Sequence, residues 1–245
     1  EIVVPNDTFL DAQFFEENGQ KLYQNGETIL KKFEEITGIA ERRYARPDQN
    51  ASDLATLAAH AAIDDAQIDK ESLDYLIVAH NFGDVSDESN RVDIVPSVAS
   101  RVKDKLQIKN PDCVAYDLPF GCPGWVEGLI QANYFIRSGD VKRCLVVGTE
   151  TLSRVIDPHD RDSMIFSDGS GAAVLEASEE DNVGLIAHKT QTYATDHINM
   201  LCMGHSYSPY AAGKSDLYIK MQGRKVYEFA LKHVPAVIKE VIDKA

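Results

Sequence analysis

The sequence predicts an α/β fold built on a largely parallel sheet. Between residues 52 and 150, apolar runs of strand length alternate with longer segments of helical periodicity. The runs are apolar throughout, as expected of strands that crossover helices bury on both faces. The order strand, helix, strand, helix, strand is typical of βαβ units.

The elements of this region are expected in a fixed order. Ser52 is the expected N-cap of the first helix, and Pro96 lies near the start of the second, where a proline costs little. The elements are a helix over 52–69, a strand over 73–80, a helix over 94–108, a strand over 113–118, a helix over 123–137 and a strand over 143–150.

The alternation changes after residue 150. Two short apolar runs around glycines in 164–178 predict a hairpin, with DGSG (168–171) as its turn. A phosphate-binding loop is not expected there, because the GxGxxG spacing is missing. We expect another strand at 183–194 and an irregular segment over 195–217. A helix over 223–245 contains Pro235, which predicts a kink or a break.

Composition and charge exclude several classes of protein. The 245 residues suffice for one large α/β domain or two small ones. A net charge of −14 argues against nonspecific nucleic-acid binding. No segment approaches the run of about 20 apolar residues that spans a membrane, and the chain opens without a basic and then apolar leader. We therefore expect a cytoplasmic protein with no membrane or nucleic-acid partner, although a local basic patch would still permit an acidic carrier.

The four cysteines do not form a metal site. No CxxC pair and no zinc-type Cys/His spacing occurs, so no metal is expected. Cys113 and Cys144 lie in apolar strand-like runs and are expected to be buried.

Cys122 has a different context, between Gly121 and Pro123 at the expected start of a helix. Pro123 suits a first helical turn, and the free N–H groups and dipole of that turn would stabilise a thiolate. The glycines beside it, Gly121 and Gly124, permit a tight turn and close approach of a substrate. The pattern alone leaves two interpretations about equal: a nucleophile, or a structural thiol at a turn.

Six segments resemble one family when they are taken together and in order. They are ITGIAERRYA (36–45), VPSVASRV (95–102), FGCPGWVEGLIQA (120–132), VVGTETLS (146–153), FSDGSGAAVLE (166–176) and MQGRKVYEFA (221–230). The resemblance is to the β-ketoacyl-acyl-carrier-protein synthase III family of the thiolase superfamily, and it runs through nearly the whole chain.

The resemblance implies a thiolase-like fold, in which two similar halves, each a mixed five-stranded sheet flanked by helices, form α-β-α-β-α layers. On that template residues 1–178 are the N-terminal half without its opening strand, and 179–245 begin the C-terminal half. The chain then looks truncated at both ends, because the histidine and asparagine that the family uses further on have no match here.

The resemblance also implies an acyltransferase activity. The residue matching Cys122 takes an acyl group from an acyl-CoA, and a decarboxylative Claisen condensation with malonyl-acyl-carrier protein follows, in fatty-acid or related biosynthesis. A homodimer is implied, and no cofactor, since the CoA thioester is a substrate. Without the histidine and asparagine, we expect acylation but little or no condensation.

Seven further positions match substrate-binding positions of the family. Val95 corresponds to a residue that reaches across the dimer into the partner's acyl pocket, and valine there predicts tolerance of branched or longer acyl groups. Phe166 corresponds to the acyl tunnel and Arg161 to a CoA phosphate contact. The pantetheine channel is matched by Met221, Gly223, Arg224 and Tyr227. For each of these, an ordinary packing or surface role is the competing interpretation.

Two departures keep alternatives open. Lys32 and Ile36 occupy positions where the family often has a tryptophan and an arginine that bind the CoA nucleotide, so an acyl-carrier donor competes with acyl-CoA. Glu88 lies upstream of Cys122 at a spacing similar to the catalytic glutamate of hydroxymethylglutaryl-CoA synthases, although a solvated loop charge is the simpler interpretation. The alternatives are a condensing or acyl-transfer enzyme without decarboxylation, and a non-catalytic partner subunit.

Overall fold

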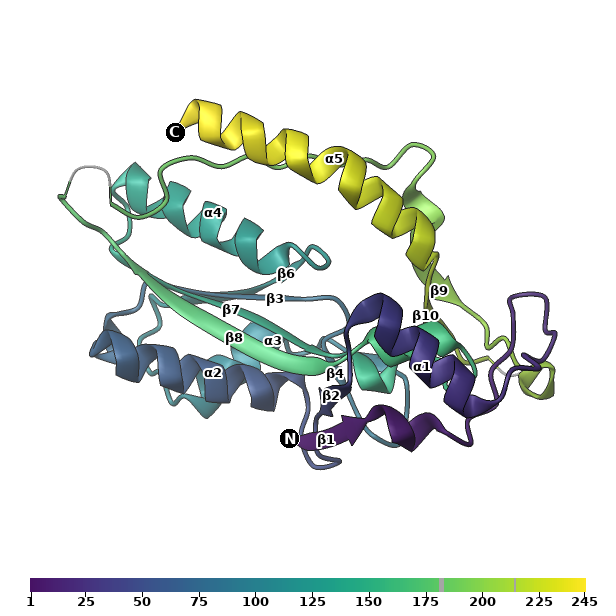
Figure 1. Ribbon diagram of the computed structural model, residues 1–245. Helices are drawn as coiled ribbons and strands as arrows, with labels where there is room; N and C mark the ends of the chain where they lie inside the picture. The colour runs from purple at the N-terminus through teal and green to yellow at the C-terminus, as the bar shows by residue number, and fades with distance from the viewer. Residues whose placement is uncertain (181–182, 214) are drawn as a thin grey trace.

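The computed structural model describes residues 1–180, 183–213 and 215–245. Its centre is a four-stranded mixed sheet in the order β6-β3-β7-β8 (Figure 1). Strands β3 (Tyr75–His80), β6 (Val114–Pro119) and β7 (Arg143–Thr151) are parallel, and β8 (Asp168–Glu176) is antiparallel to β7. The predicted α/β class is confirmed, and the three parallel strands lie where the apolar runs placed them.

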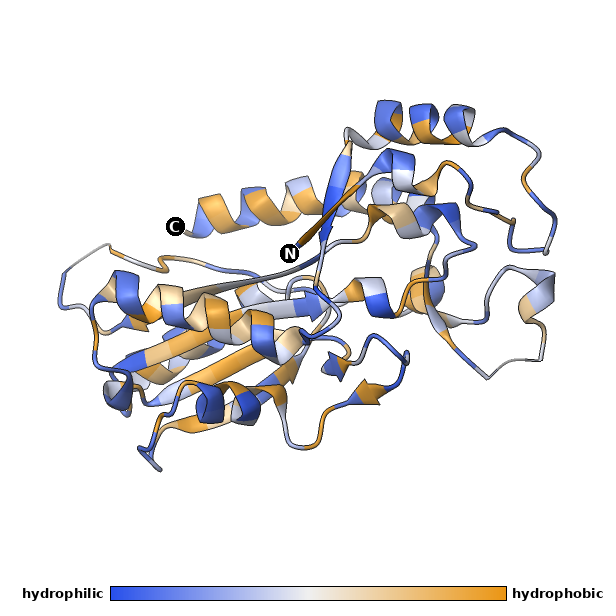
Figure 2. Ribbon diagram, turned by 90° about the horizontal axis from the view of Figure 1, so that it is seen from below, coloured by the Kyte–Doolittle hydropathy of each residue, from blue (hydrophilic) through white to orange (hydrophobic). Residues whose placement is uncertain are grey.

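Helices cover both faces of this sheet. Helices α2 (Ala51–Ala66) and α3 (Val98–Lys105) pack on one face, and α4 (Gly124–Ser138) packs on the other (Figure 1). Leu76, Val78, Leu145 and Val147 point toward α2 and α3, whereas Ile77 and Val146 belong to the core beneath α4. This alternation follows from the two-residue period of a strand and explains why the strands are apolar at every position. Figure 2 shows the same contrast, with apolar strands beside helices that are mixed in hydropathy.

The remaining elements surround one end of the sheet. Helix α1 is Gly26–Thr37. Three antiparallel pairs lie outside the main sheet: β1 (Ile2–Pro5) with β2 (Glu41–Tyr44), β4 (Asp84–Val85) with β5 (Val92–Asp93), and β9 (Leu201–Gly204) with β10 (Tyr218–Met221). Two short 3₁₀ helices, Leu152–Arg154 and Arg161–Ile165, lie between β7 and β8 in the chain. Among the described residues, no helix has the length and apolarity that crossing a membrane requires.

The predicted hairpin over 164–178 is wrong, and DGSG is not a turn. Residues 168–176 form one continuous strand whose Gly169 and Gly171 pair with Glu150 and Gly148 of β7. A nine-residue neighbour strand supplies hydrogen bonds along the whole segment, so the glycines are held extended.

The predicted strand over 183–194 is also wrong, since none of its residues belongs to a strand. Instead the segment runs along α4, where the Thr190 hydroxyl donates to Glu127 and His188 contacts the Tyr134 ring. A strand needs a neighbouring backbone, and this segment lies against side chains. Part of the expected second half lies outside the described residues, namely 181, 182 and 214, of which 214 belongs to the expected irregular segment. The expected division of the chain at 178/179 stays a prediction.

Three helices differ from expectation. Helix α2 begins one residue before Ser52, with Asn50 as its N-cap and the Asp53 carboxylate accepting the Asn50 N–H. Helix α3 begins at Val98 and ends at Lys105, so Pro96 precedes it, and Ser97 is the N-cap. Helix α5 (Gly223–Lys244) runs through Pro235 without a break. The Phe229 ring of α5 contacts the rings of Tyr193 and His197.

Candidate active site

Cys122 lies in the connection between β6 and α4, where the chain reverses its direction. β6 ends at Pro119, and α4 begins at Gly124 with Pro123 as its N-cap. Gly121 has φ +79°, a left-handed conformation that glycine adopts without a steric cost, and its carbonyl accepts the Gly124 N–H at 2.9 Å. The Cys122 side chain is exposed at the head of the helix, as the nucleophile interpretation requires.

Small residues let α4 lie unusually close to the sheet. A Cβ at Gly128 would be 2.7 Å from Val146 Cγ1, and one at Gly124 would be 3.0 Å from Ala79 Cβ. Gly148 of β7 lies under Trp125, whose Nε1 donates to the Val146 carbonyl at 3.3 Å. These contacts fix the height of the helix above β3 and β7, and with it the position of Cys122.

A cavity of about 390 Å³ opens beside Cys122 at the carboxyl ends of the parallel strands. It is lined by the ends of β3 and β7, the Cys122 turn and the first half of β8: Ala79, His80, Asn81, Gly121, Cys122, Trp125, Gly148, Thr149, Glu150, Leu152, Ser167, Asp168, Gly169, Ser170 and Gly171. The carboxyl end of parallel strands is the usual place for a ligand in an α/β sheet.

His80, at the end of β3, is a buried residue of this cavity that the sequence did not single out. Its Nδ1 accepts the Gly83 N–H at 3.0 Å, and its Nε2 lies 2.9 Å from Asp117 Oδ2. The ring therefore lies between the Gly83 N–H and the Asp117 carboxylate.

Asp117 links the cavity to helix α3. Its carboxylate also accepts the N–H groups of Val98 and Ala99, at 2.9 and 2.7 Å, which are donors of the first turn of α3. Burial acts to raise the pKa of Asp117, but the hydrogen bonds from His80 and the two N–H groups outweigh it, and the pKa lies below its ordinary value.

Glu150, at the end of β7, is the second cavity residue that sequence reasoning missed. Its Oε2 accepts the backbone N–H and the side-chain amide of Asn81, both at 2.7 Å. Burial raises the pKa of Glu150, against the effect of these hydrogen bonds. A polar residue directly after a buried parallel strand was the available signal, at His80 and at Glu150 alike.

The other predicted site residues lie away from the Cys122 cavity. Val95 is 82% exposed, and Phe166 packs in a separate apolar cluster with Val85, Val155 and Ile219. Phe166 is followed by Ser167, which does line the cavity.

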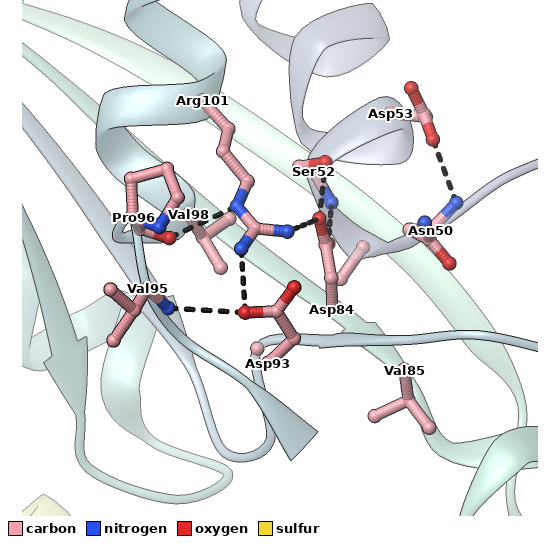
Figure 3. A network of polar contacts seen from close by, with 12 residues as sticks. Asn50, Ser52, Asp53, Asp84, Val85, Asp93, Val95, Pro96, Val98 and Arg101 are labelled. Carbon is pink, nitrogen blue, oxygen red and sulfur yellow. Dashed lines mark hydrogen bonds and ion pairs between the residues drawn. The ribbon is translucent and has the colours of Figure 1, made fainter. Parts of the chain in front are cut away.

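A polar network holds the loop that carries Val95 (Figure 3). Arg101 of α3 contacts Asp84 and Asp93 at 2.7 and 2.8 Å, and its Nε donates to the Pro96 carbonyl at 3.0 Å. Asp93 in turn accepts the Val95 N–H, and Asp84 accepts the N–H and the hydroxyl of Ser52. The exposed position of Val95 is therefore fixed by α2, α3 and the β4–β5 pair together.

The residues predicted for the pantetheine channel lie at the junction of β10 and α5. Met221 ends β10, and Gly223 begins α5. A Cβ at Gly223 would lie 3.4 Å from Asp162 Oδ2. Arg161, the predicted phosphate contact, is half-exposed and lies 3.7 Å from Asp162, so it is a neighbour of this junction. Arg224 and Tyr227 are exposed on the first turns of α5, where Arg224 pairs with Glu228.

Three remaining sequence features are placed clearly. Lys32 and Ile36 are both exposed on α1. Glu88 lines a different cavity, of about 660 Å³, together with Arg91, Arg154 and Asp216. In the part of the chain that the structure describes, no three His, Cys, Asp or Glu side chains gather as a metal site would require.

A sheet flanked by helices, with a glycine-bordered cysteine at the head of a closely packed helix, defines a thiolase-like α/β protein. The family model of 3-oxoacyl-[acyl-carrier-protein] synthase III matches residues 116–194, which include the Cys122 turn. The chain is therefore similar to the β-ketoacyl-acyl-carrier-protein synthase III family in its sequence and in its fold.

Individual relatives show the same similarity. The chain is 37% identical to a β-ketoacyl-[acyl-carrier-protein] synthase III from Ehrlichia canis over 219 residues. This alignment covers 89% of this chain and 63% of the relative. The crystal structure of 3-oxoacyl-(acyl carrier protein) synthase III from Pseudomonas aeruginosa superposes with a TM-score of 0.77 at 27% identity, over 100% of this chain and 67% of that one. The Thermus thermophilus enzyme gives 0.72 at 30% identity, over 95% and 65%. The chain thus spans about two thirds of the length of these relatives.

Proposed function

We propose that this chain performs the acyl-transfer chemistry of a β-ketoacyl-acyl-carrier-protein synthase III, with Cys122 as the acyl acceptor. The observation that carries the proposal is the exposed thiol at the head of α4, facing a cavity at the carboxyl edge of the sheet. The first turn of a helix has N–H groups without an intrahelical acceptor, and these stabilise both a thiolate and the oxyanion of a tetrahedral intermediate.

In the proposed reaction Cys122 attacks the thioester of an acyl-CoA or an acyl-carrier protein, and the donor leaves as a thiol. A decarboxylative condensation with malonyl-acyl-carrier protein follows in the family, in fatty-acid biosynthesis. The exposed Lys32 and Ile36 offer no aromatic surface to an adenine, which favours the carrier donor over CoA. Arg161 and the start of α5 are the proposed contacts for the phosphopantetheine arm.

We also propose that the protein is a homodimer in the cytoplasm. Val95, Val92 and Ile94 are exposed on the loop that Arg101 holds, which supports a surface covered by a second copy. Native mass spectrometry tests the dimer, and Val95→Asp is expected to weaken it because a charge in an apolar contact is costly.

The test of the central proposal is the intact mass of the protein after exposure to a panel of acyl-CoA and acyl-carrier donors. We expect a mass gain of one acyl group that is absent in Cys122→Ala, and the best donor decides between CoA and carrier. No adduct from any donor, with the protein folded by circular dichroism, would contradict the proposal and favour a non-catalytic partner.

The same preparations test condensation. We expect the 245-residue chain to form the acyl adduct and to give no 3-oxoacyl product from malonyl-acyl-carrier protein, because the family's histidine and asparagine have no match in it. Product detected by mass spectrometry above the Cys122→Ala background would contradict this expectation.

The alternative of a hydroxymethylglutaryl-type condensation gains no support from the geometry. It required Glu88 beside Cys122, and Glu88 lines a separate cavity.

A further inference from the structure

Two glycines of β8, Gly169 and Gly171, lack a side chain for no reason that the strand itself supplies. Both belong to an unbroken ladder, paired with Glu150 and Gly148 of β7, and neither has a positive φ. Among the described residues, apart from those adjacent in the chain, none has an atom within 4 Å of a Cβ built at either position. Glycine weakens a strand, and without a bulge or a tight bend it marks a place that a ligand or another backbone approaches. The two positions therefore point to an occupant of the space over β8.

Both glycines face the side of the sheet that carries α4. A Cβ at Gly148 would lie 3.1 Å from Trp125 Cβ, so Gly148 faces that helix. Gly171 is the paired neighbour of Gly148, and paired residues of antiparallel strands project to the same face. Gly169 lies two residues before Gly171 and shares this face. Gly171 is thus one strand spacing, about 4.8 Å, from the residue that Trp125 covers.

The Cys122 cavity is bounded by these glycines. Its volume of about 390 Å³ is within the range of roughly 300–1,000 Å³ that is typical of small-molecule sites. Trp125, in the first turn of α4 and 37% exposed, lines the cavity as well. An exposed indole beside a strand without side chains leaves an apolar space next to the thiol.

The lining favours an uncharged hydrocarbon over a phosphate or a carboxylate. No lysine or arginine belongs to the described cavity lining, whereas Glu150 and Asp168 do. An anionic group would meet these carboxyl groups without a compensating cation, which is costly where water is partly excluded. Ala79 and Leu152 add apolar surface. The acyl chain of a donor thioester is an uncharged group that must lie beside Cys122 for transfer to occur.

We infer that Gly169 and Gly171 are specificity-determining residues of the Cys122 site, which rests on the proposed acyl transfer. The space that they leave over β8 accommodates an acyl chain longer than acetyl, packed against the Trp125 ring. A side chain at either position fills this space and excludes the longer chain, whereas the short acetyl group still reaches the thiol.

Acylation of Cys122 by two kinds of donor tests this inference in a Cys202→Ser background, which removes the other exposed thiol. Acetyl and octanoyl groups are offered on CoA and on a carrier protein, and intact mass follows the adduct with time. The variants are Gly171→Val, Gly169→Val and Gly171→Ala. Glu176→Val is the matched control, because it places the same side chain at the far end of β8, outside the cavity.

Trp125, the single tryptophan of the chain, gives a second readout that needs no acyl transfer. In a Cys122→Ala background octanoyl-pantetheine cannot acylate the site, and its bound acyl chain should change the Trp125 fluorescence in a saturable way. Acetyl-pantetheine is the short-chain control in the same titration.

We expect Gly171→Val and Gly169→Val to lower the octanoyl rate relative to the acetyl rate by at least about tenfold, the lower range of what an apolar pocket discriminates per methylene group. Gly171→Ala should have a smaller effect, and Glu176→Val none. The Kd of octanoyl-pantetheine should rise in the same order. The thermal midpoints of the valine variants should not fall, because a β-branched residue suits a strand and the described residues leave room for its Cβ.

An unchanged octanoyl-to-acetyl ratio in both valine variants would overturn the inference, and so would an equal loss with both donors. If the valine variants do not fold, the ratio in Gly171→Ala decides in the same way. Acetyl transfer without octanoyl transfer in the unaltered protein leaves the proposed function intact and overturns the inference. If no donor acylates Cys122, the proposed function is contradicted and the Trp125 titration decides: a Kd that Gly171→Val raises supports the inference, and an unchanged Kd or no response overturns it.

Discussion

At the scale of single residues, the four thiols divide into two pairs by burial. Cys113 and Cys144 are buried, and burial raises the pKa of Cys113 and that of Cys144, the latter to about 12. Cys122 and Cys202 are exposed. The expected burial of Cys113 and Cys144 is therefore confirmed.

We predict that iodoacetamide at about pH 8 labels Cys122 and Cys202 and leaves Cys113 and Cys144 unmodified. A thiol whose pKa is raised stays protonated at that pH, and the thiolate is the species that reacts. Peptide mapping by mass spectrometry measures the labelled positions, with Cys122→Ala as the control. Labelling of Cys144 in the folded protein would contradict the burial described here.

Sequence reasoning predicted the turn that carries Cys122 but not the residues that line the cavity beside it. Its context is local, because the glycines and the proline around it are adjacent in the chain. His80, Asp117 and Glu150 come from three strands, and their proximity depends on strand order, which local patterns do not specify.

At the scale of elements, Asp117 joins β6 to the start of α3. We predict that Asp117→Asn lowers the free energy of unfolding at pH 7 by about 1–3 kcal/mol, because an amide loses one acceptor oxygen and the charge. Urea unfolding followed by circular dichroism measures this difference. Asp104→Asn is a matched control, because Asp104 is an exposed aspartate of α3. This substitution should change the free energy of unfolding little.

The Asp117 effect is expected to depend on pH. The folded pKa is below the ordinary 3.8, so ionised Asp117 contributes its full stabilisation above that value. The contribution is lost as the pH falls through 3.8 and on through the lowered pKa. The difference between the protein and Asp117→Asn should therefore shrink as the pH is lowered from about 4 through the lowered pKa, and a constant difference would contradict this assignment.

Helix α4 depends on Gly128 for its close contact with the sheet. We predict that Gly128→Ala lowers the free energy of unfolding by about 1–3 kcal/mol, because the new methyl group would overlap Val146. Gly171→Ala is the control, since nothing lies within 4 Å of a Cβ at that position. Equal thermal midpoints for the two variants would show that α4 has room to move away from the sheet.

At the scale of the whole molecule, Lys220 connects distant parts of the chain. Its Nζ lies 2.5 Å from Asp157 and 3.3 Å from Asp160, and 3.4 Å from the centroid of the Tyr207 ring. Asp157 has no exposed side-chain surface, so the lysine is its buried counter-charge.

We predict that Lys220→Met destabilises the protein by about 3 kcal/mol or more, because it leaves the Asp157 charge buried without its partner. Lys239→Met is the matched control. Lys239 is exposed on α5, where it pairs with Asp243, and a surface pair of this kind contributes less than about 1 kcal/mol. Thermal unfolding of both variants measures the effect, and a similar small loss in each would contradict the prediction.

The sequence by itself determined the α/β class, the positions of the three parallel strands and of α4, and the turn that carries Cys122. These features rest on short-range patterns: hydrophobic period, helix caps and turn residues. The tertiary structure alone decided that residues 168–176 continue as an edge strand, that residues 183–194 form no strand, and that His80 and Glu150 line one cavity with Cys122. The reason is physical: hydrogen-bond pairing and the burial of polar atoms depend on neighbours that are distant in the chain.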